Sequence, residues 1–139
     1  MPRIELSFDR VNTYKREIAM YNDQIVELEA EAQNIGSTLN GEVRLHGSVK
    51  SDTLQIKCNK LIDRKEQLQK RIEVRKKYIS DIELLIENIK DDKTREIFKY
   101  RILEGMAWKE VAREVDKSDD HVRAVFSKKS RELSQNNTK

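Results

Sequence analysis

The side chains best suited to chemistry lie in one short stretch, WKEVAREVDKSDDHVRAVF, at positions 108–126. A helix over 119–133 would gather one apolar stripe, made of Val122, Val125, Phe126 and Leu133. Its other face would then expose Asp119, Asp120, His121, Arg123, Ala124, Ser127, Lys128 and Arg131. On such a face Asp120 can accept a hydrogen bond from cytosine N4, and Arg123 can donate to guanine or to a phosphate. Side chains suited to phosphate alone are Lys128, Lys129 and Arg131.

Two short helices joined by a polar turn must position this face. In residues 108–115, the small Ala112 lies between Val111 and Val115, as a steep crossing with a second helix requires. Ser118 stands where an N-cap would open the second helix. Helix pairs of this kind occur in DNA-binding helix-turn-helix units and also in ordinary bundles, so periodicity leaves both interpretations open.

A longer helical element is predicted upstream. Apolar side chains recur in alternating steps of three and four at Val11, Tyr14, Ile18, Tyr21, Ile25, Leu28, Ala32 and Ile35. The rhythm returns at Leu54, Cys58, Leu61, Lys65, Leu68, Ile72, Arg75, Ile79, Ile82, Ile86 and Ile89. This is the period of a coiled-coil seam. Because three glycines fall between the two runs, we expect an antiparallel helical hairpin with a Gly-rich loop at 36–50.

The second predicted helix, over 51–90, is longer than the first, so the end of its seam needs another partner. That end, Ile79, Ile82, Ile86 and Ile89, can be covered by the C-terminal part of the chain or by a second subunit, and we favour a homodimer. Lys65 and Arg75 interrupt the apolar seam. They either fix its register or lay their stems along it with the charges in water.

Between the seam and the helix pair, Asp91 and Asp92 can cap a helix over 93–104 that Gly105 ends in a left-handed conformation. The fold class expected is therefore all-α, a long hairpin followed by a compact C-terminal unit. The predicted divisions are a coiled-coil hairpin at 8–90, a helix-turn-helix domain at 91–134 and a disordered tail at 135–139.

Composition argues against an enzyme and against a membrane protein. The 139 residues are 38% charged and 37% hydrophobic with a net charge of +3, which leaves little material for a deep substrate pocket. Cys58 is the only cysteine, and neither His46 nor His121 has the neighbours of a metal site. We expect no catalytic residues, no cofactor and no metal. With no predicted signal peptide or membrane span, we expect a soluble, cytoplasmic protein.

The C-terminal stretch TREIFKYRILEGMAWKEVAREVDKSDDHVRAVFSKKSREL resembles region 4 of sigma-70-type factors. Together with the coiled coil and the segment NIGSTLNGEVRLHGSVKSD, the chain is similar to small phage and prophage transcription regulators of Gram-positive hosts. The resemblance implies sequence-specific binding of double-stranded DNA in a bacterial host cell, with host RNA polymerase as a further partner. Two positions depart from the sigma pattern: Asp116 stands where the turn commonly has glycine, and Ala107 where a Ser or Thr cap is usual.

Carried onto this chain, the resemblance assigns 108–112 to the positioning helix and 119–124 to the front of the recognition helix. The predicted base contacts are Asp120, His121, Arg123, Ala124 and Ser127. The predicted phosphate contacts are Lys109, Lys117, Lys128, Lys129 and Arg131. For Asp119 we favour a role at the helix N-terminus, where a carboxylate suits the helix dipole.

Two other classes of function remain open. The chain can be an interaction protein whose coiled coil holds RNA polymerase or another partner, with the C-terminal unit as a packing module. It can also be a DNA-packaging component, since small terminase subunits combine a helix-turn-helix with helical oligomerisation. A ring-sized oligomer would favour the second of these.

Overall fold

A computed structural model describes residues 4–137 of the chain, with the side chains of 9–35 and 53–135. Within these residues every regular element is helical: α1 (Ile4–Glu87), α2 (Asp92–Phe98), the π-helix η1 (Lys99–Leu103), α3 (Trp108–Val115) and α4 (Asp119–Asn137). The expectation of an all-α chain is confirmed. The predicted Gly-rich loop at 36–50 differs from the structure, which assigns helix through these residues as part of α1; their side chains lie outside those described. The described residues fall into two compact units, one formed by Glu17–Arg75 and the other by the segments on either side of it.

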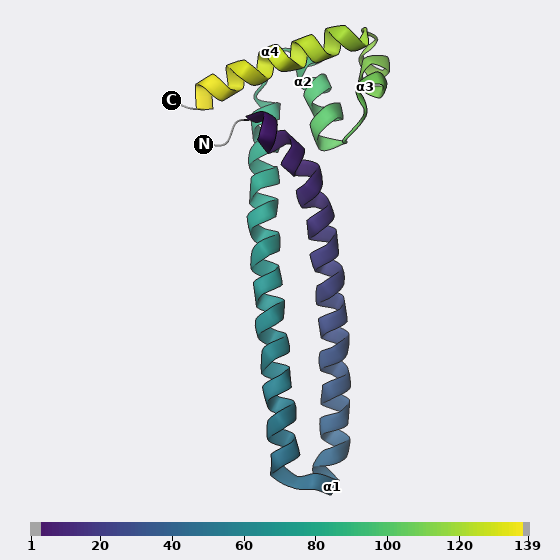
Figure 1. Cartoon of the computed structure of the whole chain (residues 1–139), viewed down its shortest axis with the longest axis vertical. Helices are drawn as coiled ribbons and strands as arrows, with labels where there is room; N and C mark the ends of the chain where they lie inside the picture. Colours follow the sequence, from purple (N-terminus) through teal and green to yellow (C-terminus); the bar gives the residue numbers. More distant parts are fainter. Residues whose placement is uncertain (1–3, 138–139) are drawn as a thin grey trace. The chain divides into compact units, whose positions relative to one another are not determined.

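The first unit pairs two stretches of α1 in opposite directions. We call residues 4–35 of α1 the first arm and residues 53–87 the second arm; the parts of the arms within this unit, 17–35 and 53–75, lie side by side in Figure 1. Contacts join Glu17 to Arg75 and Glu29 to Lys65, so later positions on the first arm meet earlier positions on the second. The core of this unit contains Tyr21, Ile25, Leu68 and Ile72, with Ile18 and Leu28 packed against them.

The two seams read from the sequence are the buried faces of the arms. Every predicted seam position from Val11 to Ile35 and from Leu54 to Ile89 is buried or partly buried. Most positions between them are exposed, as expected where helices meet along a narrow apolar stripe. Cys58 is a partly buried free thiol at one seam position.

Charged residues in the seam are paired across it. Arg75 Nε donates to Glu17 Oε2 at 2.7 Å, and the guanidinium lies 5.1 Å from the centroid of the Tyr21 ring. Lys65 Nζ lies 3.5 Å from Glu29 Oε1. Arg75 is thus paired with an anion in a partly buried place, whereas the Lys65 pair is more exposed, as expected for a stem along the seam with its charge near water.

The last part of the second seam, from Ile79 to Ile89, is buried within one chain. Ile79, Ile82, Ile86 and Ile89 have exposed fractions of 8%, 7%, 0% and 3%. Of the two partners expected for this part of the seam, the chain itself provides the cover, so this seam gives no support to the favoured homodimer. The sequence showed an uncovered stripe, but contacts between segments distant in the chain cover it in the second unit. A dimer would need another surface.

Helix α1 ends at Glu87, three residues before the predicted boundary, and a short connection leads into α2. Asp91 caps α2 as predicted: its Oδ2 accepts hydrogen bonds from Thr94 N at 2.9 Å and from Thr94 Oγ1 at 2.7 Å. The bond from the Thr94 hydroxyl lowers the pKa of Asp91 most, and the bond from the Thr94 N–H lowers it further. The cap therefore stabilises the start of α2 most strongly in the ionised state.

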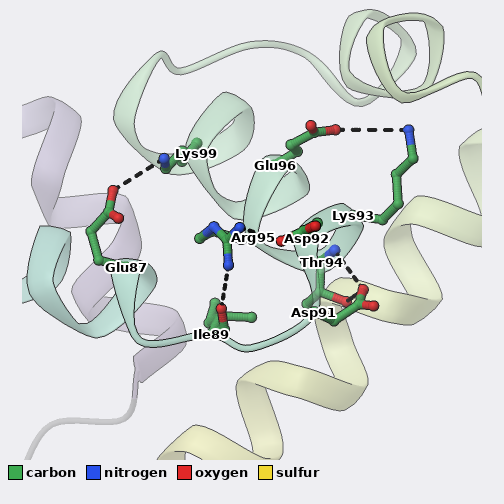
Figure 2. A network of polar contacts seen from close by, with 9 residues as sticks. All are labelled: Glu87, Ile89, Asp91, Asp92, Lys93, Thr94, Arg95, Glu96 and Lys99. Carbon is green, nitrogen blue, oxygen red and sulfur yellow. Dashed lines mark hydrogen bonds and ion pairs between the residues drawn. The ribbon is translucent and has the colours of Figure 1, made fainter.

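Arg95 forms polar contacts that link the segment between α1 and α2 to α2. Its Nη1 donates to the carbonyl of Ile89 at 2.7 Å, and its Nη2 pairs with Asp92 (Figure 2). Lys99 reaches back to Glu87 with an N–O distance of 3.1 Å. These contacts join the end of α1 to the following helices by polar bonds on both sides of the connection.

The predicted helix over 93–104 does not stay α-helical throughout. After Phe98 it widens into η1, where the N–H of Glu104 bonds to the carbonyl of Lys99, five residues earlier, at 3.1 Å. Gly105 then adopts φ +66°, as predicted for the terminating glycine. The N–H of Met106 bonds to the carbonyl of Tyr100, six residues earlier, at 3.0 Å, so the wide hydrogen-bonding pattern continues past Gly105. The spacing of apolar residues did not predict the π-helix η1.

The three short helices share a core. Buried residues Ile97, Val111, Ala112, Val115 and Val122 form its centre. Three aromatic rings close it: Phe98 stacks on Phe126 with centroids 4.6 Å apart, and Trp108 meets Phe126 edge to face at 5.1 Å. Figure 1 shows α2, α3 and α4 grouped around this region. The small side chain of Ala112 lies in this core beside Val122, as the sequence pattern requires.

Candidate nucleic-acid interface

The candidate interface is built on α4, which a three-residue turn joins to α3. Asp116 ends α3 in the left-handed region, with φ 56° and ψ 49°. Ser118 then opens α4, since its Oγ accepts a hydrogen bond from the N–H of His121 at 3.1 Å. The prediction of an N-cap at Ser118 is confirmed. By contrast, Ala107 gives α3 no side-chain cap, as the sequence indicated.

The exposed face of α4 carries most of the predicted contact residues. Val122 is fully buried, and Val125, Phe126 and Leu133 are partly buried on the same side. Every predicted base-contact residue is exposed: Asp120, His121, Arg123, Ala124 and Ser127. With Lys128 and Arg131, which are also exposed, they form what we call the polar face of α4. A helix with one buried stripe and one polar face can present the latter to a groove.

The predicted phosphate contacts are less uniform. Lys109 on α3 and Lys117 in the turn are exposed. Lys129 is partly buried and lies 3.4 Å from Glu132; both line a hollow between α2 and α4 together with Thr94, Val125 and Lys128. The structure therefore separates Lys129 from the polar face, because 3.6 residues per turn place it on the side of Val122 and Val125.

Arg123 is held in place on the polar face. Its Nε donates to Asp119 Oδ1 at 2.8 Å, one helical turn earlier. Its guanidinium carbon also lies 6.0 Å from the centroid of the Trp108 ring. Asp119 therefore pairs with a cation of its own helix, while Ser118 supplies the cap. The pairing was missed in the sequence, although the spacing of four residues between Asp119 and Arg123 would have revealed it.

Trp108 joins the candidate interface to the core. One edge of its indole packs against Phe126, and Arg101 from η1 lies over the ring at 4.5 Å. Arg101 is fixed in turn by a 2.9 Å hydrogen bond from its Nη1 to the carbonyl of Met106. Trp108 therefore packs against the shared core of the short helices. The arginines on the ring are an addition that the sequence did not indicate.

A second feature lies where α1 begins and η1 ends. A hollow of about 360 Å³ is lined by Asp9, Asn12, Arg101, Ile102, Gly105, Trp108 and Phe126. The Lys15 ammonium donates to the carbonyl of Leu103 beside it. The lining combines acidic, amide, basic and aromatic groups, without a set of like groups that would select one ligand.

Among the described side chains, no group of three or more His, Cys, Asp or Glu residues could hold a metal ion. None of the helices in the described part of the chain has a stretch that is apolar enough and long enough to cross a bilayer.

Ser130 on α4 was not singled out in the sequence. It is fully buried, and its hydroxyl has no hydrogen-bond partner among the described residues.

No family model matches the chain, and no curated protein or solved structure matches it with significance.

Proposed function

We propose that the chain is a sequence-specific double-stranded DNA-binding protein in which α3 and α4 act as a helix-turn-helix. The observation that carries the proposal is the polar face of α4, which lies opposite the stripe that packs into the shared core. In this arrangement α4 is the recognition helix, and α3 supports it. The three-residue turn with a left-handed first residue has the length that such units use.

Base reading falls to the N-terminal half of α4, whose exposed groups can complement base edges. Arg123 offers donors to guanine, and Asp120 offers an acceptor to cytosine. Lys109, Lys117, Lys128 and Arg131 then contact phosphates, which gives affinity without sequence information. The resemblance to sigma region 4 supports this assignment and adds the biological setting proposed here, regulation of phage or prophage transcription with host RNA polymerase as partner.

The proposal is tested by selection from a random duplex library with purified wild-type protein at about 150 mM salt, where binding through phosphates alone is weak. We expect one or a few sequences to be enriched. No enriched sequence would exclude a specific reader.

Variants of the polar face then separate the two kinds of contact. Arg123→Ala should lower discrimination between the selected duplex and its single-base variants by about 1–3 kcal/mol if Arg123 contacts a base. Lys128→Ala should weaken binding to all duplexes and reduce the salt slope by about one. Lys60→Ala, which removes an exposed lysine from the second arm, is the matched control and should change neither quantity. A loss at one base position on Lys128→Ala would contradict its assignment to phosphate.

A second candidate is an interaction protein, favoured by the apolar residues that the paired arms leave exposed. In the Glu17–Arg75 unit the exposed large apolar side chains include Met20, Val26, Ile56, Ile62 and Val74. A protein partner could cover them, whereas duplex DNA would not. The same selection separates the candidates, because an interaction protein enriches no duplex.

A further inference from the structure

We propose that Asp119 is a specificity-determining residue, which positions Arg123 so that its terminal nitrogens point to a guanine. This inference rests on the proposed DNA-binding function and names a residue that the base-contact assignment did not include. Asp119 is the first residue of α4, and Arg123 follows one turn later. Asp119 would act through Arg123 and contact no base itself.

The geometry of the pair leaves the reading atoms available. Asp119 accepts from Nε of Arg123 at 2.8 Å, and no hydrogen bond in the described part of the structure engages the two terminal nitrogens of this guanidinium. Recognition of guanine O6 and N7 uses two parallel donors of one guanidinium. A carboxylate on Nε fixes the plane of the group and keeps the Nη donors for this purpose.

Trp108 restricts the same guanidinium from a second direction. The ring centroid lies 6.0 Å from Cζ of Arg123, at the outer range of a cation–π contact. The Arg123 side chain is still 57% exposed, so it remains accessible to a ligand. An exposed arginine without these neighbours would lose more rotamer freedom on binding. Asp119 and Trp108 restrict that freedom before DNA arrives.

The charge of Asp119 gives the proposal a distinctive signature. A carboxylate near the phosphates lowers affinity for every duplex, so its neutralisation should strengthen or leave unchanged the binding to unrelated DNA. If Asp119 also positions Arg123, the same substitution should weaken preference for one G·C pair. If Asp119 only stabilised the helix, its substitution would not weaken preference at one base pair while binding to unrelated DNA stayed equal or increased.

The test uses the full chain and, as probes, the duplex most enriched by the wild-type protein, its single-base-pair variants and one unrelated duplex. Arg123→Ala identifies the G·C position that Arg123 reads. Asp119→Asn should reduce preference at that same position by roughly two- to fivefold, the range for an exposed charged pair. Binding to the unrelated duplex should stay equal or increase. In the Arg123→Ala background, Asp119→Asn should change preference at that position no further.

Glu132→Gln provides the matched control, because it removes the ion pair with Lys129 on the opposite side of α4. It should leave preference at every position unchanged. Helical content and thermal midpoint, measured by circular dichroism, should be close to wild type for all variants, since the substituted positions are exposed or partly exposed.

Three results overturn the inference. The first is that Asp119→Asn keeps the wild-type preference at the base pair where Arg123→Ala loses it. Asp119 would then not be a positioning residue, and the proposed function would stand. Equal losses at all positions, with a lower thermal midpoint, would show a purely structural role. Failure of the wild-type protein to enrich any duplex would overturn the proposed function and this inference together.

Discussion

Asp116 carries the main backbone strain in the turn between α3 and α4. It is the only non-glycine residue with positive φ among those that the structure describes, at 56°. The conformation lets the N–H of Lys117 bond to the carbonyl of Ala112 at 3.0 Å and so ends α3. Asp tolerates the left-handed region better than most residues, but glycine has no Cβ to crowd there. Aspartate at this position therefore has a cost in stability relative to glycine.

Asp116→Gly is expected to raise the free energy of unfolding by about 0.5 kcal/mol, because relief of left-handed strain exceeds the flexibility added to the unfolded chain. Asp116→Ala is expected to lower it by about the same amount, since Ala has no side-chain oxygen to stabilise the turn. Urea unfolding of the three proteins measures both changes. Equal stability of the Gly and Ala variants would show that residue 116 does not need a left-handed conformation.

At the scale of elements, opposite charges favour the antiparallel pairing of the arms. Residues 17–35 contain five acidic and no basic side chains, whereas 53–75 contain seven basic and three acidic. The pairs Glu17–Arg75 and Glu29–Lys65 are the described contacts of this kind. They differ in burial: the Glu17 and Arg75 side chains are 27% and 20% exposed, while those of Glu29 and Lys65 are 52% and 39% exposed. The more buried pair is less screened by solvent.

Glu17→Gln should therefore destabilise the paired arms by about 1 kcal/mol, because it removes the negative charge that lies 2.7 Å from Arg75 in the seam. Glu29→Gln, the matched variant at the more exposed pair, should cost at most about 0.5 kcal/mol. Thermal unfolding at low and at high salt measures both. If the two variants lose the same stability, or if salt abolishes both losses equally, burial does not distinguish the pairs.

The helices themselves follow from the sequence with small errors. The seam residues, the caps at Asp91 and Ser118 and the ending at Gly105 were all predicted from local chemistry and are confirmed. The end of α1 at Glu87 and the π-helix at Lys99–Leu103 were not predicted. Apolar spacing reports which face of a helix is buried, but it does not report where hydrogen bonds change from four to five residues. The identity of α3 and α4 as a helix-turn-helix remains a prediction.

At the scale of the whole molecule, Gly105 joins segments more than ninety residues apart. A Cβ built on Gly105 would lie 3.1 Å from Oδ1 and 3.2 Å from Nδ2 of Asn12 on α1. The glycine therefore serves two purposes, a left-handed helix ending and a close approach of two parts of the same compact unit. Only the first is visible in the sequence.

Gly105→Ala is expected to lower the free energy of unfolding by about 1–2 kcal/mol, from left-handed strain together with crowding against Asn12. Asn12→Ala in that background should recover the part that is due to crowding. A double-mutant cycle by urea unfolding, with Asn12→Ala alone as control, measures the coupling. Strictly additive effects would show that Asn12 and Gly105 do not constrain each other.

Assembly is also decided at this scale. The dimer expected from the sequence rested on a seam that the chain itself buries, so self-association remains a prediction without that support. Sedimentation of the full chain across a range of concentrations measures it. A particle of the size of a ring oligomer would favour the DNA-packaging alternative.

The sequence by itself determined the local elements: two seams of alternating three- and four-residue steps, two acidic or hydroxyl caps, one terminating glycine and a short helix with one apolar and one polar face. Each of these depends on neighbours within a few residues, which is the range over which spacing and capping act. Only the tertiary structure decided that Ile79–Ile89 is covered within the chain, that Arg75 meets Glu17 and that Trp108 lies near two arginines. Periodicity states that a face must be buried, and many partners satisfy that requirement. The partner is chosen by packing and charge between segments far apart in the chain.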